Sequence, residues 1–155
     1  MELDRIDRKI LDVLQGDNQI TNLALAERVA VSPPSCLRRV RRLREEGVIV
    51  ADVSIVDPRA LGRGVTAIVQ VHLNDERLDL RDGFARAMRR RAEVTQCYLV
   101  TGDPDFVLIV QVSDMAAFEE FTRAALYADT NVRKFTTFVT LDRIKFETRI
   151  PTDER

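Results

Sequence analysis

Apolar residues recur every three to four positions through the first third of the chain, which is the spacing of one buried helix face. The first such stripe contains Ile6, Ile10 and Leu14. Asp4 precedes the stripe and can cap a helix with its carboxylate. Residues 16–18, a Gly-Asp-Asn run, interrupt the pattern. We therefore predict a first short helix between Asp4 and this turn.

A second short helix is predicted to begin near Thr21 or Asn22 and to end around Ala30. Its expected buried positions are Leu23, Ala26 and Val29. The connection to the next helix, from Ala30 to Ser32, is very short. Two short helices joined by so tight a turn are typical of a helix-turn-helix, whose second helix enters the major groove of DNA.

A third helix is predicted from Ser32 to about Glu46, with Gly47 as its C-terminal stop. Ser32 offers a capping hydroxyl, and the Pro-Pro pair after it occupies positions where helical amides lack partners. Rotation by 100° per residue separates two faces of this helix. The expected buried face holds Cys36, Leu37, Val40 and Leu43, and the opposite face holds Ser35, Arg38 and Arg42 with Arg39 and Arg41 at its flanks.

An arginine-rich helix face is often no more than a solvated surface. Here, however, it follows a Ser-Pro start signal and a short preceding helix, and an apolar run at residues 48–55 follows it. That run predicts a short hairpin or wing, closed by Asp57 and Pro58. In combination these features favour DNA binding over a plain solvated helix.

Strands and helices alternate in the remainder of the chain. Ala67, Val69, Val71 and Leu73 share one face of a first strand. The predicted order is a strand from 65, a helix at 80–91, strands at 94–101 and 106–112, a helix capped by Ser113 or Asp114, and a last strand at 132–148. The strand at 106–112 is mostly apolar on both faces and is expected to be central in the sheet or covered on both faces. This order is the split βαβ, ferredoxin-like arrangement.

The predicted fold class is α+β, with a winged helix-turn-helix domain at residues 1–57 and a ferredoxin-like βαββαβ domain at 65–155. Residues 58–64 contain Pro58, Gly62 and Gly64 and form the expected linker. A ferredoxin-like sheet carries its helices on one face only. Homodimerisation through the other face is the favoured hypothesis, with Ile68, Tyr98 and Phe138 as candidate contacts.

The overall charge at first argues against nucleic acid as a partner. The chain has 24 Lys and Arg against 25 Asp and Glu, and its formal net charge is −1. Five of the arginines nevertheless lie between positions 38 and 44 with no acidic residue among them. Charges more than about 10 Å apart are largely screened at 0.1 M salt, so a local cluster can bind phosphate on a neutral protein. The composition therefore excludes a protein that is basic overall, but it does not exclude a single basic helix that binds DNA.

The histidine and cysteine residues, which often serve in catalysis or metal binding, do not indicate an enzyme here. His72 is the single histidine and lies mid-strand, where a surface or interface role is expected, and Cys36 and Cys97 lack the spacing of a zinc site. The two cysteines, the absence of a signal peptide and the absence of a long apolar run favour a cytoplasmic protein without a membrane partner. No catalytic residue, metal or resident cofactor is expected.

A turn at residues 102–105 is a more credible binding site. Backbone amides around Gly102 could meet a carboxylate, because glycine lets a ligand approach the chain closely. Asp103 and Asp105 could meet an ammonium group. An amino acid carries both groups, although a turn of this kind is more often a plain strand connection.

The motifs LDRIDRKILDVLQ, LALAERVAVSPPSCLRRVRRLREEGVI and VTGDPDFVLIVQVSDMAAFEEF, in this order and spacing, make the whole chain resemble the Lrp/AsnC (feast/famine) family of transcription regulators. The resemblance implies a DNA-binding helix-turn-helix and a ligand module that responds to an amino acid. It also implies dimers that often associate into octamers, as a tetramer of dimers. The alternatives are an architectural DNA-wrapping protein without small-molecule control, and a ferredoxin-like ligand-binding module.

The family's functional residues are carried over position by position. For double-stranded DNA they are Ser32, Ser35, Arg38, Arg39 and Arg42, the serines facing phosphate near the helix N-terminus. For the effector they are Thr101, Gly102, Asp103, Asp105 and Thr136. Pro104 replaces the family's usual aromatic residue, and Ala30 stands where a glycine is frequent.

Overall fold

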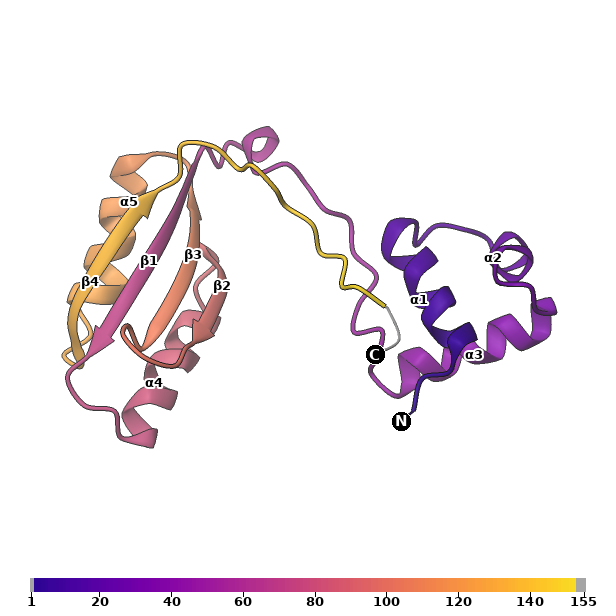
Figure 1. Cartoon of the computed structure of the whole chain (residues 1–155). Helices are drawn as coiled ribbons and strands as arrows, with labels where there is room; N and C mark the ends of the chain where they lie inside the picture. Colours follow the sequence, from indigo (N-terminus) through magenta and orange to yellow (C-terminus); the bar gives the residue numbers. More distant parts are fainter. Residues whose placement is uncertain (1, 153–155) are drawn as a thin grey trace. The chain divides into compact units, whose positions relative to one another are not determined.

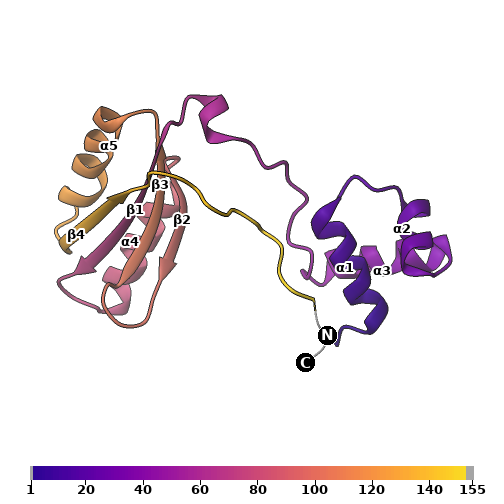
Figure 2. The same ribbon diagram turned by 45° about the horizontal axis from the view of Figure 1, so that its top comes forward.

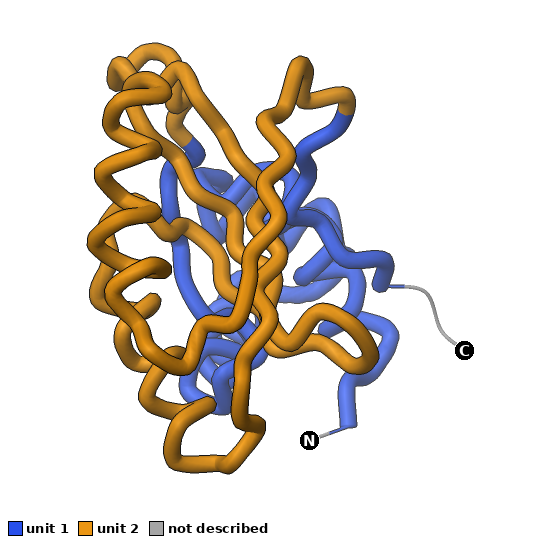
Figure 3. Tube along the Cα trace, turned by 90° about the vertical axis from the view of Figure 1, so that its left-hand side faces the viewer, with its two compact units in different colours: residues 1–55, 145–155 blue, residues 56–144 orange. Residues whose placement is uncertain are grey.

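The computed structural model describes residues 2–152 of the chain. These residues form two compact units (Figure 1 and Figure 3). One unit combines the described residues up to Ile55 with those from Lys145 onward, and the other extends from Val56 to Ile144. The chain therefore leaves the first unit, builds the second and returns to the first. Sequence patterning groups residues 145–152 with the C-terminal domain, whereas the structure places them beside the N-terminal helices.

The helices of the first unit are α1 (Arg5–Gly16), α2 (Asn22–Val29) and α3 (Pro33–Glu45). The predicted N-caps Asp4 and Thr21 are confirmed, since their side chains accept from the amides of Asp7 and Ala24. Ala30 ends α2 in the left-handed region at φ 59°, which explains why a glycine would suit this position. The buried core consists of Ile10, Leu25, Ala26, Val29, Cys36, Val40 and Leu43.

Three local predictions for these helices are wrong. Leu23 and Leu37, both expected in the core, are 59% and 48% exposed. In α2 it is Leu25 that is buried, because the short helix turns its 25-26-29 face inward. Ser32 is the N-cap residue of α3, but its side chain makes no capping hydrogen bond.

The predicted hairpin after α3 does not form, since residues 48–56 belong to no helix or strand. The amides of Val48 and Ile49 both donate to the Leu43 carbonyl, which turns the chain away from α3. Beyond this point the segment is extended, and Val50 is 90% exposed. The segment contains no Gly or Asn that would close a tight hairpin turn, which accounts for the difference.

The second unit contains β1 (Val65–Leu73), α4 (Leu78–Arg89), β2 (Val94–Leu99), β3 (Phe106–Val112), α5 (Met115–Thr122) and β4 (Val132–Val139). Within the described residues the strands form an antiparallel sheet in the order β2-β3-β1-β4, which confirms the ferredoxin-like prediction and the central position of β3. A 3-10 turn, Pro58–Leu61, lies in the predicted linker. The last strand ends at Val139, nine residues before the predicted end at 148.

Helices α4 and α5 cover one face of this sheet (Figure 1 and Figure 2). Phe84 of α4 and Phe121 of α5 are buried against the inward positions of β1 and β3. The other face carries the three candidate dimer contacts, as the register shows. Ile68 lies opposite Phe138 of β4, and Tyr98 lies opposite Val107 of β3. Tyr98 and Phe138 are each 52% exposed, so the chain alone leaves this face uncovered.

The returning segment is attached to α1 through hydrogen bonds that use its backbone. The Gln15 side chain accepts from the Ile150 amide at 2.6 Å and donates to the Ile150 carbonyl at 3.0 Å. Arg149 pairs with Asp12, and this hydrogen bond holds the pKa of the Asp12 carboxyl below its ordinary value. The predicted strand to 148 is therefore replaced by an extended segment anchored at its far end.

Replacement of Gln15 by alanine removes both backbone bonds to Ile150, so we expect the Ile150 amide to exchange with solvent about five-fold faster or more. Hydrogen exchange resolved to peptides covering 146–152 measures this. Gln19→Ala, at an exposed glutamine just beyond α1, is the matched control. Equal exchange in the two variants would show that the segment is held by something other than Gln15.

Candidate nucleic-acid interface and effector site

The five arginines of α3 divide into two groups by exposure. Arg38, Arg41 and Arg44 are exposed, whereas Arg39 and Arg42 are half-buried. The division follows from helix geometry, because Arg39 and Arg42 are three apart and lie on the side of α3 that faces α1. The predicted DNA face therefore contains arginines in two different environments.

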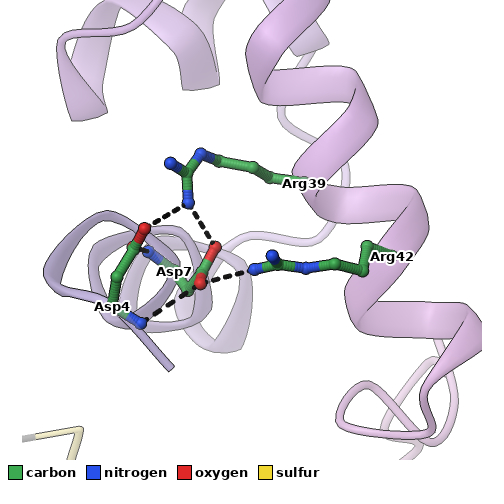
Figure 4. Close-up of polar contacts among 4 residues, drawn as sticks. All are labelled: Asp4, Asp7, Arg39 and Arg42. Atoms are coloured by element: carbon green, nitrogen blue, oxygen red, sulfur yellow. Dashed lines mark hydrogen bonds and ion pairs between the residues drawn. The ribbon is translucent and has the colours of Figure 1, made fainter. Parts of the chain in front are cut away.

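Arg39 and Arg42 point to a pair of carboxylates at the start of α1 (Figure 4). Nη1 of Arg39 lies 2.6 Å from Oδ2 of Asp4 and 2.8 Å from Oδ1 of Asp7. Nη2 of Arg42 lies 2.6 Å from the other oxygen of Asp7. We call these four residues the Asp–Arg cluster. It joins α1 to α3 through charge-assisted hydrogen bonds, which are the stronger kind.

Asp7 is the centre of the cluster, and its side chain is only 1% exposed. Its carboxylate also accepts from the Asp4 amide, while Asp4 accepts from the Asp7 amide at 2.8 Å. This reciprocal capping box fixes both carboxylates at the helix N-terminus, where the helix dipole favours negative charge. The Asp7 amide and then Arg39 hold the pKa of Asp4 below its ordinary value. Asp4 in turn raises the pKa of Arg39.

The structure therefore places two of the predicted DNA ligands, Arg39 and Arg42, on protein carboxylates. Their side chains are 22% and 41% exposed, so neither is fully enclosed by the protein. The assignment of both residues to DNA stays a prediction. Arg38 is exposed at the outward face, as the sequence predicts.

The predicted phosphate ligands Ser32 and Ser35 lie at and just inside the N-terminus of α3. Ser32 is exposed, and its hydroxyl makes no bond to the first turn of the helix. Ser35 is half-buried. Pro33 and Pro34 have no N–H, so the Ser35 amide and the Ser32 hydroxyl are the groups that can donate to a phosphate at this helix N-terminus.

The predicted effector turn connects β2 to β3. Thr101, Gly102 and Asp103 are exposed, and Gly102 has φ 88°, a left-handed conformation that favours glycine. Asp105 is used differently. Its carboxylate accepts from the Leu73 amide at 2.7 Å, and its own amide donates to the Val71 carbonyl at 3.0 Å. Asp105 therefore fixes the turn to the end of β1, and its role as an effector ligand stays a prediction.

His72 is a chemistry-bearing residue whose surroundings sequence reasoning missed. The sequence predicts nothing near it, yet it is only 4% exposed and its Nδ1 lies 2.5 Å from Oδ1 of Asp103. The turn at 101–105 folds over the end of β1, which alternation along a single strand cannot reveal.

Thr136 lies on the same outward sheet face as His72. It is exposed and stands opposite Gln70 of β1, while the next outward pair is His72 with Lys134 of β4. Asp103 contacts His72 of β1, and Thr136 stands opposite Gln70, the next outward position of the same strand. The two predicted effector residues therefore lie near one sheet face. Gln70 and Lys134 were not predicted, because only the register of β1 with β4 places them there.

Within residues 2–152, no cluster of three or more His, Cys, Asp or Glu side chains could hold a metal ion. Nor does the described chain contain a helix with the length and apolar character needed to cross a bilayer. Cys36 and Cys97 are both free thiols in the structure, and burial raises the pKa of each.

The Asp–Arg cluster should contribute measurably to stability. Asp7→Asn keeps the shape of the side chain but leaves two guanidinium groups without a full counter-charge, and we expect it to lower the free energy of unfolding by about 2 kcal/mol. Asp52→Asn is the matched control, because it breaks the exposed ion pair with Arg44 and should cost less than about 1 kcal/mol. Urea unfolding followed by circular dichroism measures both. Equal decreases would contradict the central role given to Asp7.

Comparison with known proteins agrees with the two-unit description. Residues 3–50 match the winged helix-turn-helix DNA-binding family model, and residues 66–150 match the Lrp/AsnC ligand binding domain. An HTH-type transcriptional regulator of Sinorhizobium fredii is 48% identical over 97% of this chain and 89% of its own. The leucine-responsive regulatory protein of Escherichia coli is 36% identical, with 96% of this chain and 91% of its own covered.

Solved structures give the same result. A transcriptional regulator of Neisseria meningitidis, in complex with L-Met, superposes with a TM-score of 0.90 at 35% identity, and 97% of each chain is covered. An AsnC family regulator of Agrobacterium tumefaciens superposes with a TM-score of 0.89 at 31% identity, and 96% of each chain is covered. From its matched domains, its relatives and its fold, the chain belongs to the Lrp/AsnC family of DNA-binding transcriptional regulators.

Proposed function

We propose that this regulator recognises specific sequences in double-stranded DNA through the outward face of α3, and that an amino acid bound beside the 101–105 turn alters its DNA binding or assembly. The observation that carries the proposal is the exposure of Arg38, Arg41 and Arg44 on one helix, beside arginines that the Asp–Arg cluster holds. Membership of the family already shows that the chain is a DNA-binding regulator. What we propose in addition is which residues contact DNA, that the binding is sequence-specific, and that the effector is an amino acid.

Electrostatics supports α3 as the DNA-facing element. Within the Asp–Arg cluster, two carboxylates offset the two arginines, so this part of α3 adds little net charge. Arg44 is also paired, with Asp52 at 3.0 Å. Arg38 and Arg41 therefore carry most of the uncompensated positive charge of the helix. Arginine suits this position, because its planar fork binds phosphate or guanine through two hydrogen bonds.

An amino acid suits the effector site for three reasons. The exposed amides around Gly102 can donate to a carboxylate, and the Asp103 carboxylate, 76% exposed, can accept from an ammonium group. Thr136 and Gln70 supply further polar groups on the same sheet face. The Neisseria relative forms a complex with L-Met. The buried Pro104 in place of an aromatic side chain shapes this turn differently, so the effector need not be methionine.

The proposed mode of DNA binding requires a dimer that presents two recognition helices. The sheet face opposite α4 and α5 exposes Tyr98 and Phe138, and a second copy that packs against this face would cover both. A two-fold dimer presents two copies of α3. Such a pair reads half-sites about 34–36 Å apart, or a multiple of that spacing. Further association into octamers would extend the DNA path along several dimers.

Removal of the two uncompensated arginines should weaken DNA binding. We expect Arg38→Ala combined with Arg41→Ala to lower affinity about ten-fold or more and to reduce the slope of log K against log salt by about one for each phosphate that is no longer bound. Arg86→Ala combined with Arg90→Ala, two exposed arginines at the end of α4, is the matched control. Fluorescence anisotropy across a salt series measures both quantities. An unchanged slope in the α3 variant would refute the assignment.

The effector should be found by thermal shift with each of the twenty amino acids. A ligand at a hundred times its Kd should raise Tm by about 4 °C or more. Asp103→Asn and Thr136→Val should each reduce that shift, while Asp142→Asn, at an exposed position beyond β4, should leave it intact. A flat result for every amino acid, with DNA binding retained, would favour the architectural DNA-wrapping alternative.

A further inference from the structure

The exposed surface of α3 contains an apolar residue beside its free arginines. Leu37 is 48% exposed and is not among the residues packed against the N-terminal core. At 100° per residue, Leu37, Arg41 and Arg38 fall in this order within an arc of about 100°, and Leu37 is at the end of the arc nearest to the buried Val40. Leu37 is therefore part of the surface that α3 presents, not of the protein interior.

The Asp–Arg cluster determines which side chains occupy this surface. Because Arg39 and Arg42 are held against α1, they lie outside the arc that contains Leu37. The same contacts fix the rotation of α3 about its own axis, since both arginines are anchored to one buried carboxylate. Leu37 thus projects in a defined direction, with the positive charges of Arg41 and Arg38 on one side of it.

A lone exposed leucine is common on protein surfaces and needs no explanation by itself. The position of this one is informative, because Arg41 and Arg38 lie next to it on the helix and bring it close to the bases when α3 enters the major groove. The groove edges of the bases are polar with one exception, the C5-methyl group of thymine. A leucine buried against any other base edge would leave a donor or acceptor without a partner.

We propose that Leu37 is a specificity-determining residue that reads thymine through contact with its C5-methyl group. The inference rests on the proposed function of α3 and adds a base identity to it. Arg38 and Arg41 bind the phosphates or guanines beside that thymine. Each half-site of the preferred DNA then contains a thymine next to the position that Arg38 contacts.

The test uses the full chain and a DNA duplex selected by it from a random-sequence library. Each thymine of that duplex is replaced in turn by uracil, which lacks only the methyl group. For the wild-type chain we expect the change at one thymine per half-site to lower affinity about four-fold, the effect of burying one methyl group. With Leu37→Ala, uracil and thymine at that position should bind equally.

Leu23→Ala is the matched control, because Leu23 is also an exposed leucine and lies on α2. It should preserve the thymine preference in full. Both substitutions lie on the surface, so Tm should remain within about 2 °C of the wild-type value, which confirms that the variants are folded.

The outcomes are separable. A thymine preference that disappears with Leu37→Ala and persists with Leu23→Ala supports the inference. A preference that persists in Leu37→Ala, or a duplex in which no thymine is sensitive to uracil, overturns it while the DNA-binding function stands. Failure of the chain to select any duplex would overturn the proposed function, and the inference with it.

Discussion

The buried carboxylate of Asp7 is the interaction on which the DNA-facing surface depends. The capping box of α1 anchors this carboxylate, which accepts hydrogen bonds from both Arg39 and Arg42 of α3. A single side chain therefore fixes α3 against α1. A buried charge is costly unless it is paired and hydrogen-bonded, and here both oxygens have charged partners. The cluster therefore holds α3 in a single orientation and leaves Leu37, Arg38 and Arg41 facing outward.

This arrangement explains how a protein with a formal net charge of −1 can belong to a family of DNA-binding regulators. The positive charge of α3 is reduced by Asp4, Asp7 and Asp52, and what remains is concentrated at Arg38 and Arg41. Weak, sequence-independent attraction to phosphate scales with the number of free positive charges. A helix that keeps few of them free must obtain more of its affinity from fitted contacts.

Much of the fold could be predicted from the sequence, because capping residues and strand alternation are local signals. Asp4, Thr21 and Asp114 begin their helices as expected, and Phe106–Val112 is the predicted central strand. The errors arise where contacts with a segment distant in the sequence determine the local structure. Leu37 belongs to the predicted apolar stripe by spacing, but α1 and α2 pack on only part of that stripe. His72 meets Asp103 through a turn some thirty residues later, and residues 145–152 leave the sheet because Gln15 and Asp12 bind them.

The proposed division of roles is that Arg39 and Arg42, held by Asp7, position α3, while Arg38 and Arg41 contact DNA. It is tested most directly by the salt dependence of DNA affinity in the Asp7→Asn variant, measured at a temperature where the variant is folded. The account predicts weaker binding with an unchanged slope of log K against log salt, because α3 is less well oriented while its phosphate contacts stay the same in number. A higher affinity with a steeper slope would contradict it, since the released arginines would then be binding phosphate themselves.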